Sequence, residues 1–130
     1  MCIRDRTNGA KLGILHGAAA YVCQDNEGQI NDTASISAGL DYPGVSPIHC
    51  FLKDVKRARY TSATDEAALN AYKLVTKLEK INPSLEPSHA FAEAIKIAPK
   101  LNKDTIIIVN SCGDAKKDRD ILKERLGKIN

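Results

Sequence analysis

Hydrophobic residues recur at helical spacing in four stretches of the 130-residue chain and predict four helices. The first begins after Ser46, which precedes a proline, and the second begins after Thr64; both residues are good N-caps. A third helix starts at Pro87 and stops or kinks at Pro99. The fourth ends at Gly127, which we expect to adopt the left-handed conformation of a C-cap.

Extended segments alternate with these helices. YVCQDNEGQIND, residues 21–32, is typical of a hairpin whose turn lies at 25–28. RARYTS (57–62) and SLE (84–86) are short extended runs, and TIIIVN (105–110) is apolar on both faces, as strands buried in parallel sheets are. The alternation predicts an α/β fold with right-handed crossovers.

The composition of the chain argues against several classes of binding partner. A hydrophobic fraction of 43% is enough for the core of one domain, and 19 basic residues against 16 acidic ones give a net charge of only +3. Four tyrosines, two phenylalanines and lysines at helical spacing make neither a stacking platform nor a basic stripe, so we expect no nucleic-acid partner. The longest aliphatic run is too short to span a bilayer, and the four cysteines lack metal-ligand spacing, which indicates a reduced, cytoplasmic chain without a membrane partner.

Candidate chemistry follows from the predicted sheet, because ligands of open parallel sheets bind beyond the carboxyl ends of the strands. Two such ends are polar: Glu86 and His89 lie in LEPSH, and Ser111 and Cys112 lie in NSCGD. A loop rich in glycine and proline, SISAGLDYPG, carries Asp41 and is placed to close over both.

Each of these side chains also has a structural interpretation on the residues alone. Asp41 suits a turn-stabilising residue, His89 a surface or capping residue, Glu86 a partner of the helix dipole, and Cys112 a small buried hydrophobe. A pair of Cys112 and His89 would instead suit a cysteine hydrolase, which predicts a thiol that alkylating reagents attack readily.

Six segments, taken together, resemble the C-terminal third of the tryptophan synthase β subunit, in matching order and spacing from about residue 7 to the end. They are LGILHG (12–17), QDNEGQI (24–30), SISAGLDYPGV (35–45), TDEAAL (64–69), PSLEPSHA (83–90) and IIIVNSCGDAKKD (106–118). The resemblance implies residues 7–130 of a fold-type II pyridoxal-phosphate enzyme, an incomplete parallel-sheet α/β domain. Residues 1–6, MCIRDR, match nothing in the family, and we expect a foreign or artefactual leader there.

The resemblance also implies an activity. The family is a lyase that joins L-serine to indole by β-elimination and β-replacement, the last step of tryptophan biosynthesis, with pyridoxal 5'-phosphate as cofactor. Its implied partners are a second β subunit and an α subunit that supplies the indole.

Site residues carry over by position. Asp41 matches an aspartate that helps to close the site, Gly39 a backbone contact near the cofactor, and Glu86 the acid beside the pyridine ring. The carbonyls of Tyr42 and Gly44 fall where the family binds a monovalent cation.

One cofactor-binding position departs from the family. Cys112 stands where a serine hydroxyl of the family hydrogen-bonds the pyridine nitrogen, and a thiol is a weaker partner; Ser111 is one place away and is the alternative. A neutral group at this position keeps the nitrogen unprotonated and favours elimination. DAKKD also replaces the usual RGDKD, although Lys117 and Asp118 still match.

The Schiff-base lysine, the catalytic glutamate beside it and the Gly-rich phosphate cradle of the family find no match in the chain. All belong to the part of the family that precedes residue 7. The resemblance therefore predicts a fragment that is inactive alone. A free-standing accessory module without catalysis is the alternative.

Overall fold

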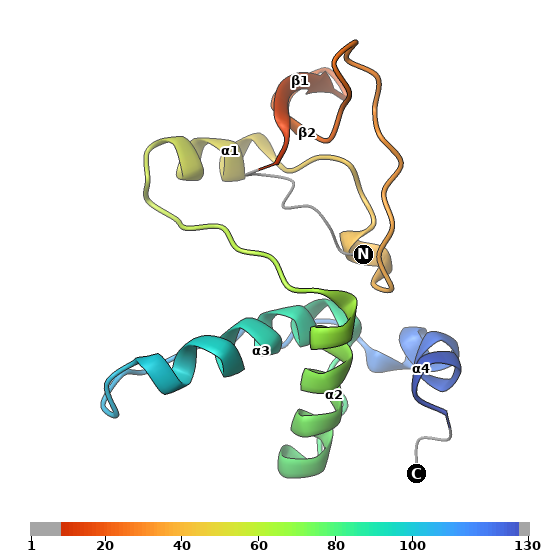
Figure 1. Cartoon of the computed structure of the whole chain (residues 1–130), viewed down its shortest axis with the longest axis vertical. Helices are drawn as coiled ribbons and strands as arrows, with labels where there is room; N and C mark the ends of the chain where they lie inside the picture. The colour runs from red at the N-terminus through yellow and green to blue at the C-terminus, as the bar shows by residue number, and fades with distance from the viewer. Residues whose placement is uncertain (1–8, 128–130) are drawn as a thin grey trace. The chain divides into compact units, whose positions relative to one another are not determined.

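The computed structural model describes residues 9–127, and Figure 1 traces their helices and strands. They divide into two compact units. The first unit comprises residues 9–35 and 41–62, and the second unit comprises residues 36–40 and 63–127. Mixed helix and strand was predicted, and both occur.

A two-stranded antiparallel hairpin opens the first unit. β1 (Lys11–Leu15) pairs along its whole length with β2 (Ala18–Val22). His16 and Gly17 make the two-residue turn with φ of 50° and 77°, the left-handed conformation that a tight hairpin needs. The hydrophobic pattern of these residues predicted no hairpin.

The hairpin predicted at 21–32 is reduced to a single bridge, between Gln24 and Ile30. Its turn does form at the predicted place, because Asp25 Oδ1 accepts from the N–H groups of Glu27 and Gln29, each at 2.9 Å. The turn was therefore predicted correctly, and the extended runs were predicted correctly in part. Tyr21 and Val22 belong to β2, and the N–H of Asn31 donates to the Cys23 carbonyl at 2.9 Å across the turn.

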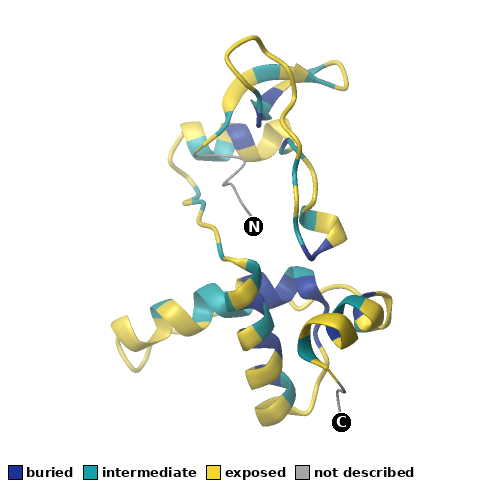
Figure 2. Cartoon of the chain, turned by 45° about the vertical axis from the view of Figure 1, so that its right-hand side comes forward, coloured by how far each residue is buried: buried dark blue, intermediate teal, exposed yellow. Residues whose placement is uncertain are grey.

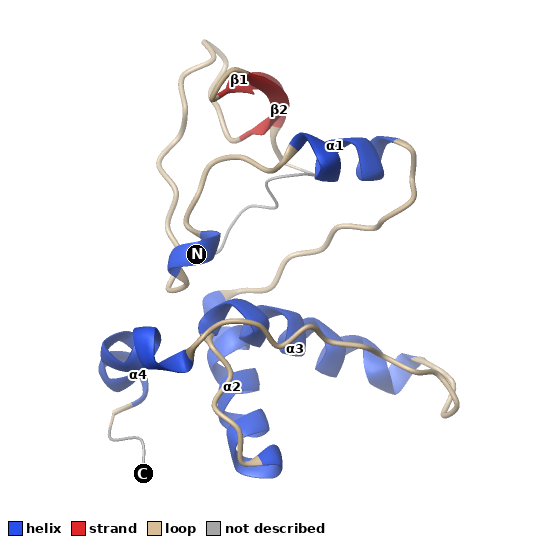
Figure 3. Cartoon of the chain, turned by 180° about the vertical axis from the view of Figure 1, so that it is seen from behind, coloured by secondary structure: helices blue, strands red, loops and turns tan. Residues whose placement is uncertain are grey.

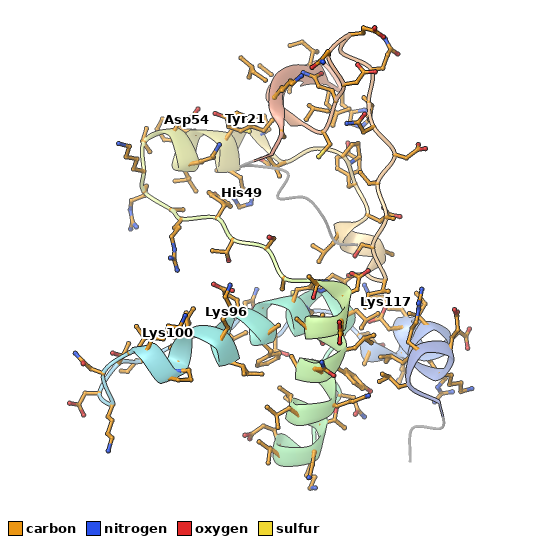
Figure 4. All side chains as sticks on the ribbon, in the orientation of Figure 1. Tyr21, His49, Asp54, Lys96, Lys100 and Lys117 are labelled. Carbon is orange, nitrogen blue, oxygen red and sulfur yellow. The ribbon has the colours of Figure 1, made fainter. Side chains whose placement is uncertain are left out.

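Helix α1 (Pro47–Asp54) packs on β2 and begins as predicted, with Ser46 Oγ accepting from the N–H of Ile48 at 3.3 Å. Figure 4 labels Tyr21 of β2 and Asp54, the last residue of this helix, and the tyrosine hydroxyl donates to Asp54 Oδ1 at 2.6 Å. Two apolar residues of the helix are not covered, since Ile48 is 69% exposed and Phe51 62% exposed. The helix buries Cys50 instead, whose Sγ atom accepts from the N–H of Tyr21 in β2 at 3.1 Å.

Helices form the second unit, as Figure 3 shows. They are α2 (Asp65–Glu79), α3 (Leu85–Ile97) and α4 (Arg119–Leu126), with 3-10 turns η1 (Ala38–Leu40), η2 (Ala98–Lys100) and η3 (Ala115–Asp118). α2 packs on α3, and the buried residues in Figure 2 gather where the helices meet. The core cluster consists of Ile36, Tyr72, Leu85 and Leu122.

Helix boundaries agree with the sequence in part. Thr64 caps α2 through the N–H of Ala67 at 3.2 Å, and α3 gives way to a 3-10 turn at Pro99, both as predicted. The predicted start of α3 at Pro87 is wrong, because the helix begins two residues earlier. Gly127 has positive φ but an extended ψ of −158°, so it is not the left-handed cap that was expected.

The predicted parallel sheet does not form within residues 9–127, whose one named sheet is the β1–β2 hairpin. Residues 57–62 are irregular, residues 85–86 belong to the first turn of α3, and residues 105–110 have no regular structure. In the last of these segments Ile106 is 85% exposed and Ile108 is 90% exposed. A strand needs a neighbouring strand to satisfy its backbone groups, and a parallel neighbour is absent from the described residues.

No described helix is both long enough and apolar enough to cross a membrane.

Candidate functional site

The Glu86 carboxylate joins three distant segments of the second unit. It lies in the first turn of α3, and its Oε1 atom accepts from the backbone N–H of Gly39 in η1 at 3.0 Å. The same oxygen accepts from Nζ of Lys117 in η3, which Figure 4 labels. The structure thus brings together two predicted cofactor-binding residues, Gly39 and Glu86. It adds Lys117, which matches the family at its position but had been given no role.

The environment keeps Glu86 charged. Its burial alone would raise the pKa of the carboxyl group, but hydrogen bonds from Lys117, from the N–H groups of Glu86 and Gly39 and from the hydroxyl of Ser37 lower that pKa to about 2. In turn, the hydrogen bond to Glu86 raises the pKa of Lys117. Both groups are therefore ionised at neutral pH.

Two glycines allow this close approach. A Cβ atom on Gly39 would lie 2.7 Å from Glu86 Oε1, and a Cβ atom on Gly113 would lie 2.5 Å from Ser84 Oγ. Gly113 also has φ of +89°, a conformation that side chains disfavour. Both positions accept only glycine without a shift of their neighbours.

The loop that follows residues 105–110 exposes the other two predicted residues. Ser111 and Cys112 are both exposed, while Cys23 and Cys50 are buried. The Cys112 carbonyl accepts from Ser84 Oγ at 3.0 Å, so the backbone of the loop is attached to the start of α3. The side chains of Cys112 and Ser111 are exposed, so a ligand could reach the thiol and the hydroxyl.

Sequence reasoning gave no role to two residues that build this site. Ser84 is fully buried and Asp118 is 3% exposed. Asp118 Oδ2 accepts from the N–H of Leu85 at 2.8 Å, across 33 positions of sequence. A polar residue just before each of two helices was the available signal, but it did not show that Asp118 contacts a different helix from the one it precedes.

The predicted pair of Cys112 and His89 does not form, since no hydrogen bond joins these two described residues. His89 is buried, its Nδ1–H donates to the Leu85 carbonyl at 2.7 Å, and its Nε2 lies 3.5 Å from Asp65 Oδ1. The histidine thus joins α2 to α3 from a buried position, so it is not the surface or capping residue of the structural interpretation.

Asp41, Tyr42 and Gly44 belong to the first unit, so their relation to Glu86 stays a prediction. Their loop is attached to β2: Gly44 bridges Val22, and the Pro43 carbonyl accepts from the N–H of Cys23 at 2.7 Å. Asp41 itself is exposed.

Comparison with known proteins decides the family. The chain is 55% identical over 106 residues to the tryptophan synthase beta chain of Allorhizobium ampelinum, which covers 82% of this chain and 26% of the relative. It is 51% identical over 117 residues to the tryptophan synthase beta chain of Bordetella petrii, covering 90% and 29%. The predicted resemblance to the tryptophan synthase β family is confirmed. A third tryptophan synthase beta chain, from Rhodopseudomonas palustris, is 52% identical over 119 residues, covering 92% and 30%.

No family model matches the chain. The chain spans less than a third of the length of these tryptophan synthase beta chains, 26% to 30% of each. Within the chain, however, the similarity covers 82% to 92% and reaches far beyond the six motifs that first suggested tryptophan synthase.

Proposed function

We propose that the chain is the C-terminal part of a pyridoxal-phosphate-dependent tryptophan synthase β subunit, which condenses L-serine with indole to give L-tryptophan. The observation that carries the proposal is the convergence of Gly39, Glu86 and Lys117 in a chain 51% to 55% identical to tryptophan synthase beta chains. The segments with the most specific resemblance are the ones that meet.

The residues present suit the cofactor. When bound, pyridoxal phosphate supplies an electron sink for carbanion chemistry at the substrate. Glu86 is ionised at neutral pH and therefore carries no proton that it could donate to the pyridine nitrogen. Its charge is balanced by Lys117, which also occupies its Oε1 atom. The exposed thiol of Cys112, or the hydroxyl of Ser111, is then the neutral partner of that nitrogen.

Two further roles belong to the loop at residues 41–44. Asp41 closes the site over the substrate, consistent with an exposed carboxylate in a loop whose next residues are attached to β2. The carbonyls of Tyr42 and Gly44 bind a monovalent cation in this proposal. The attachment of Gly44 to Val22 supports the cation site only by limiting the freedom of the loop.

The rest of the longer protein completes the fold. Residues 105–110 have the apolar sequence of a buried parallel strand, yet most of them are exposed. This combination suits a strand that joins a parallel, fold-type II sheet whose other strands lie outside this chain. The whole protein then works in the cytoplasm as a β–β homodimer with an α subunit that supplies indole.

The chain alone should be inactive, because no lysine of the 130 residues stands in the family's Schiff-base context. The test replaces the matched segment of the Bordetella petrii beta chain with the corresponding residues of this chain. Tryptophan formation from L-serine and indole by this chimera, but not by the isolated chain, supports the proposal. A chimera that folds and binds the cofactor but makes no tryptophan favours the accessory module instead.

A further inference from the structure

Helix α3 is capped in an unusual way. Ser46 and Thr64 each accept a hydrogen bond at the start of their own helix, but the N-cap residue of α3, Ser84, makes no such bond. Its hydroxyl donates instead to the Cys112 carbonyl at 3.0 Å. The free N–H at the start of α3, that of Leu85, is satisfied by Asp118.

The Asp118 carboxylate hydrogen-bonds a helix that is distant in sequence. It is 3% exposed, and it makes no capping bond to α4, the helix that directly follows it. Burial disfavours a carboxylate unless the group is hydrogen-bonded, and the N-terminus of a helix is a favourable place for a negative charge. The hydrogen bond that Asp118 Oδ2 accepts from the N–H of Leu85 at 2.8 Å therefore offsets the cost of burying the carboxylate.

The segment 112–118 is thus attached to α3 at both of its ends. Ser84 holds the carbonyl at residue 112, Asp118 holds Leu85, and Glu86 and Lys117 pair beside the second attachment. The attachment points Ser84, Leu85 and Glu86 are consecutive in sequence, so we expect a shift of the loop at one of them to change the other two.

We propose that Asp118 is a positioning residue, which caps α3 from outside the helix and thereby holds Lys117 and the 111–113 loop against Glu86. Its relevance to the reaction rests on the proposed function, because only then does that loop face a cofactor. The attachment itself is a property of this chain and is measurable without any cofactor.

Carbon-13 NMR titration of the Glu86 carboxyl in the full chain tests the proposal. Asp118→Asn keeps a carbonyl that accepts from Leu85 N–H, and it should leave the pKa of Glu86 near 2. Asp118→Ala removes the acceptor, frees Lys117 to move away, and should raise that pKa by about one unit or more. An Asp118→Ala chain with the pKa of Glu86 unchanged overturns the proposal.

A second measurement does not depend on a folded variant. The scalar coupling across the hydrogen bond, from the Leu85 amide nitrogen to the Asp118 carboxyl carbon, should be detectable in the unsubstituted chain, and its absence contradicts the cap. In the chimera, Asp118→Asn should restore the tryptophan-forming rate that Asp118→Ala loses. Inactivity of the unsubstituted chimera would count against the proposed function alone, since neither NMR result depends on it.

Discussion

Oε1 of Glu86 accepts a hydrogen bond from the backbone N–H of Gly39 at 3.0 Å, although 47 positions separate the two residues in sequence. Lys117, which follows Glu86 by 31 positions in sequence, donates to the same oxygen through Nζ. One carboxylate therefore fixes η1 and the segment 112–118 to the first turn of α3.

Glu86→Gln should destabilise the chain by about 1 to 2 kcal/mol at pH 7, because the amide loses the ion pair with Lys117. The folded-state pKa of Glu86, about 2, lies below the ordinary value of 4.5, so the carboxylate stabilises the fold above pH 4.5. That contribution is lost as the pH falls from 4.5 through 2. Urea denaturation at several pH values should show the difference between the two chains shrinking over this window.

The matched control is Glu93→Gln on the same helix. Glu93 pairs at 3.0 Å with Lys96, whose side chain is 61% exposed, and exposed pairs contribute little. This substitution should cost less than about 0.5 kcal/mol. Equal losses for both variants would show that the Glu86 contacts are ordinary surface contacts.

Gly113→Ala should destabilise the chain by about 2 to 4 kcal/mol, since it combines a positive φ with a clash against Ser84 Oγ. Gly28→Ala separates these causes, because Gly28 has a similar φ of +84° with nothing within 4 Å of its Cβ position. That variant should lose only about 1 kcal/mol. Thermal melting of both chains provides the comparison, and similar losses would mean that the Ser84 contact is unimportant.

Local signals predicted the helices well. Ser46 and Thr64 cap the helices they precede, and Ala68 and Ala71 are buried in α2 as their spacing indicates, because caps and helical periodicity depend on residues close in sequence. Leu78 continues the same helical spacing but is 63% exposed, because the described residues do not cover the end of the helix there.

Strands were predicted poorly because a strand is defined by its neighbour. The sequence of residues 105–110 has the apolar character of a buried parallel strand, yet among residues 9–127 no strand pairs with it. The β1–β2 hairpin was missed since its turn places His16 at positive φ, a conformation that is uncommon for any residue other than glycine.

The candidate site was predicted mainly through the family resemblance. That resemblance singled out Gly39 and Glu86, which the structure joins, but composition and spacing gave no reason to pair them. Asp118 was matched without a role, because a cap supplied from 33 positions away leaves no local pattern.

Cys112 should be the first of the described cysteines to react with iodoacetamide, since it is exposed while Cys23 and Cys50 are buried. Mass spectrometry after short labelling checks this, and faster labelling of Cys50 would contradict the structure.

In the chimera, Cys112→Ser should raise the tryptophan-forming rate about 2- to 10-fold, because a hydroxyl is the better hydrogen-bonding partner. Complete loss of activity would instead indicate that the thiol itself takes part in the reaction.

Self-association of the isolated chain should decrease when Ile106 and Ile108 are replaced together by lysine. These side chains are 85% and 90% exposed and lie in a segment whose backbone is open to pairing. Leu78→Lys, at another exposed apolar position, controls for the added charge and should have a smaller effect. Sedimentation velocity measures the outcome, and an unsubstituted chain that is fully monomeric would contradict it.

The most direct test is the rate of tryptophan formation from L-serine and indole by the Bordetella petrii beta chain carrying this chain's segment, with pyridoxal phosphate added. We predict cofactor-dependent product from the chimera, strongly reduced by Glu86→Ala, and none from the isolated chain. A folded, cofactor-loaded chimera that forms no tryptophan, or an isolated chain that does, would contradict the assignment.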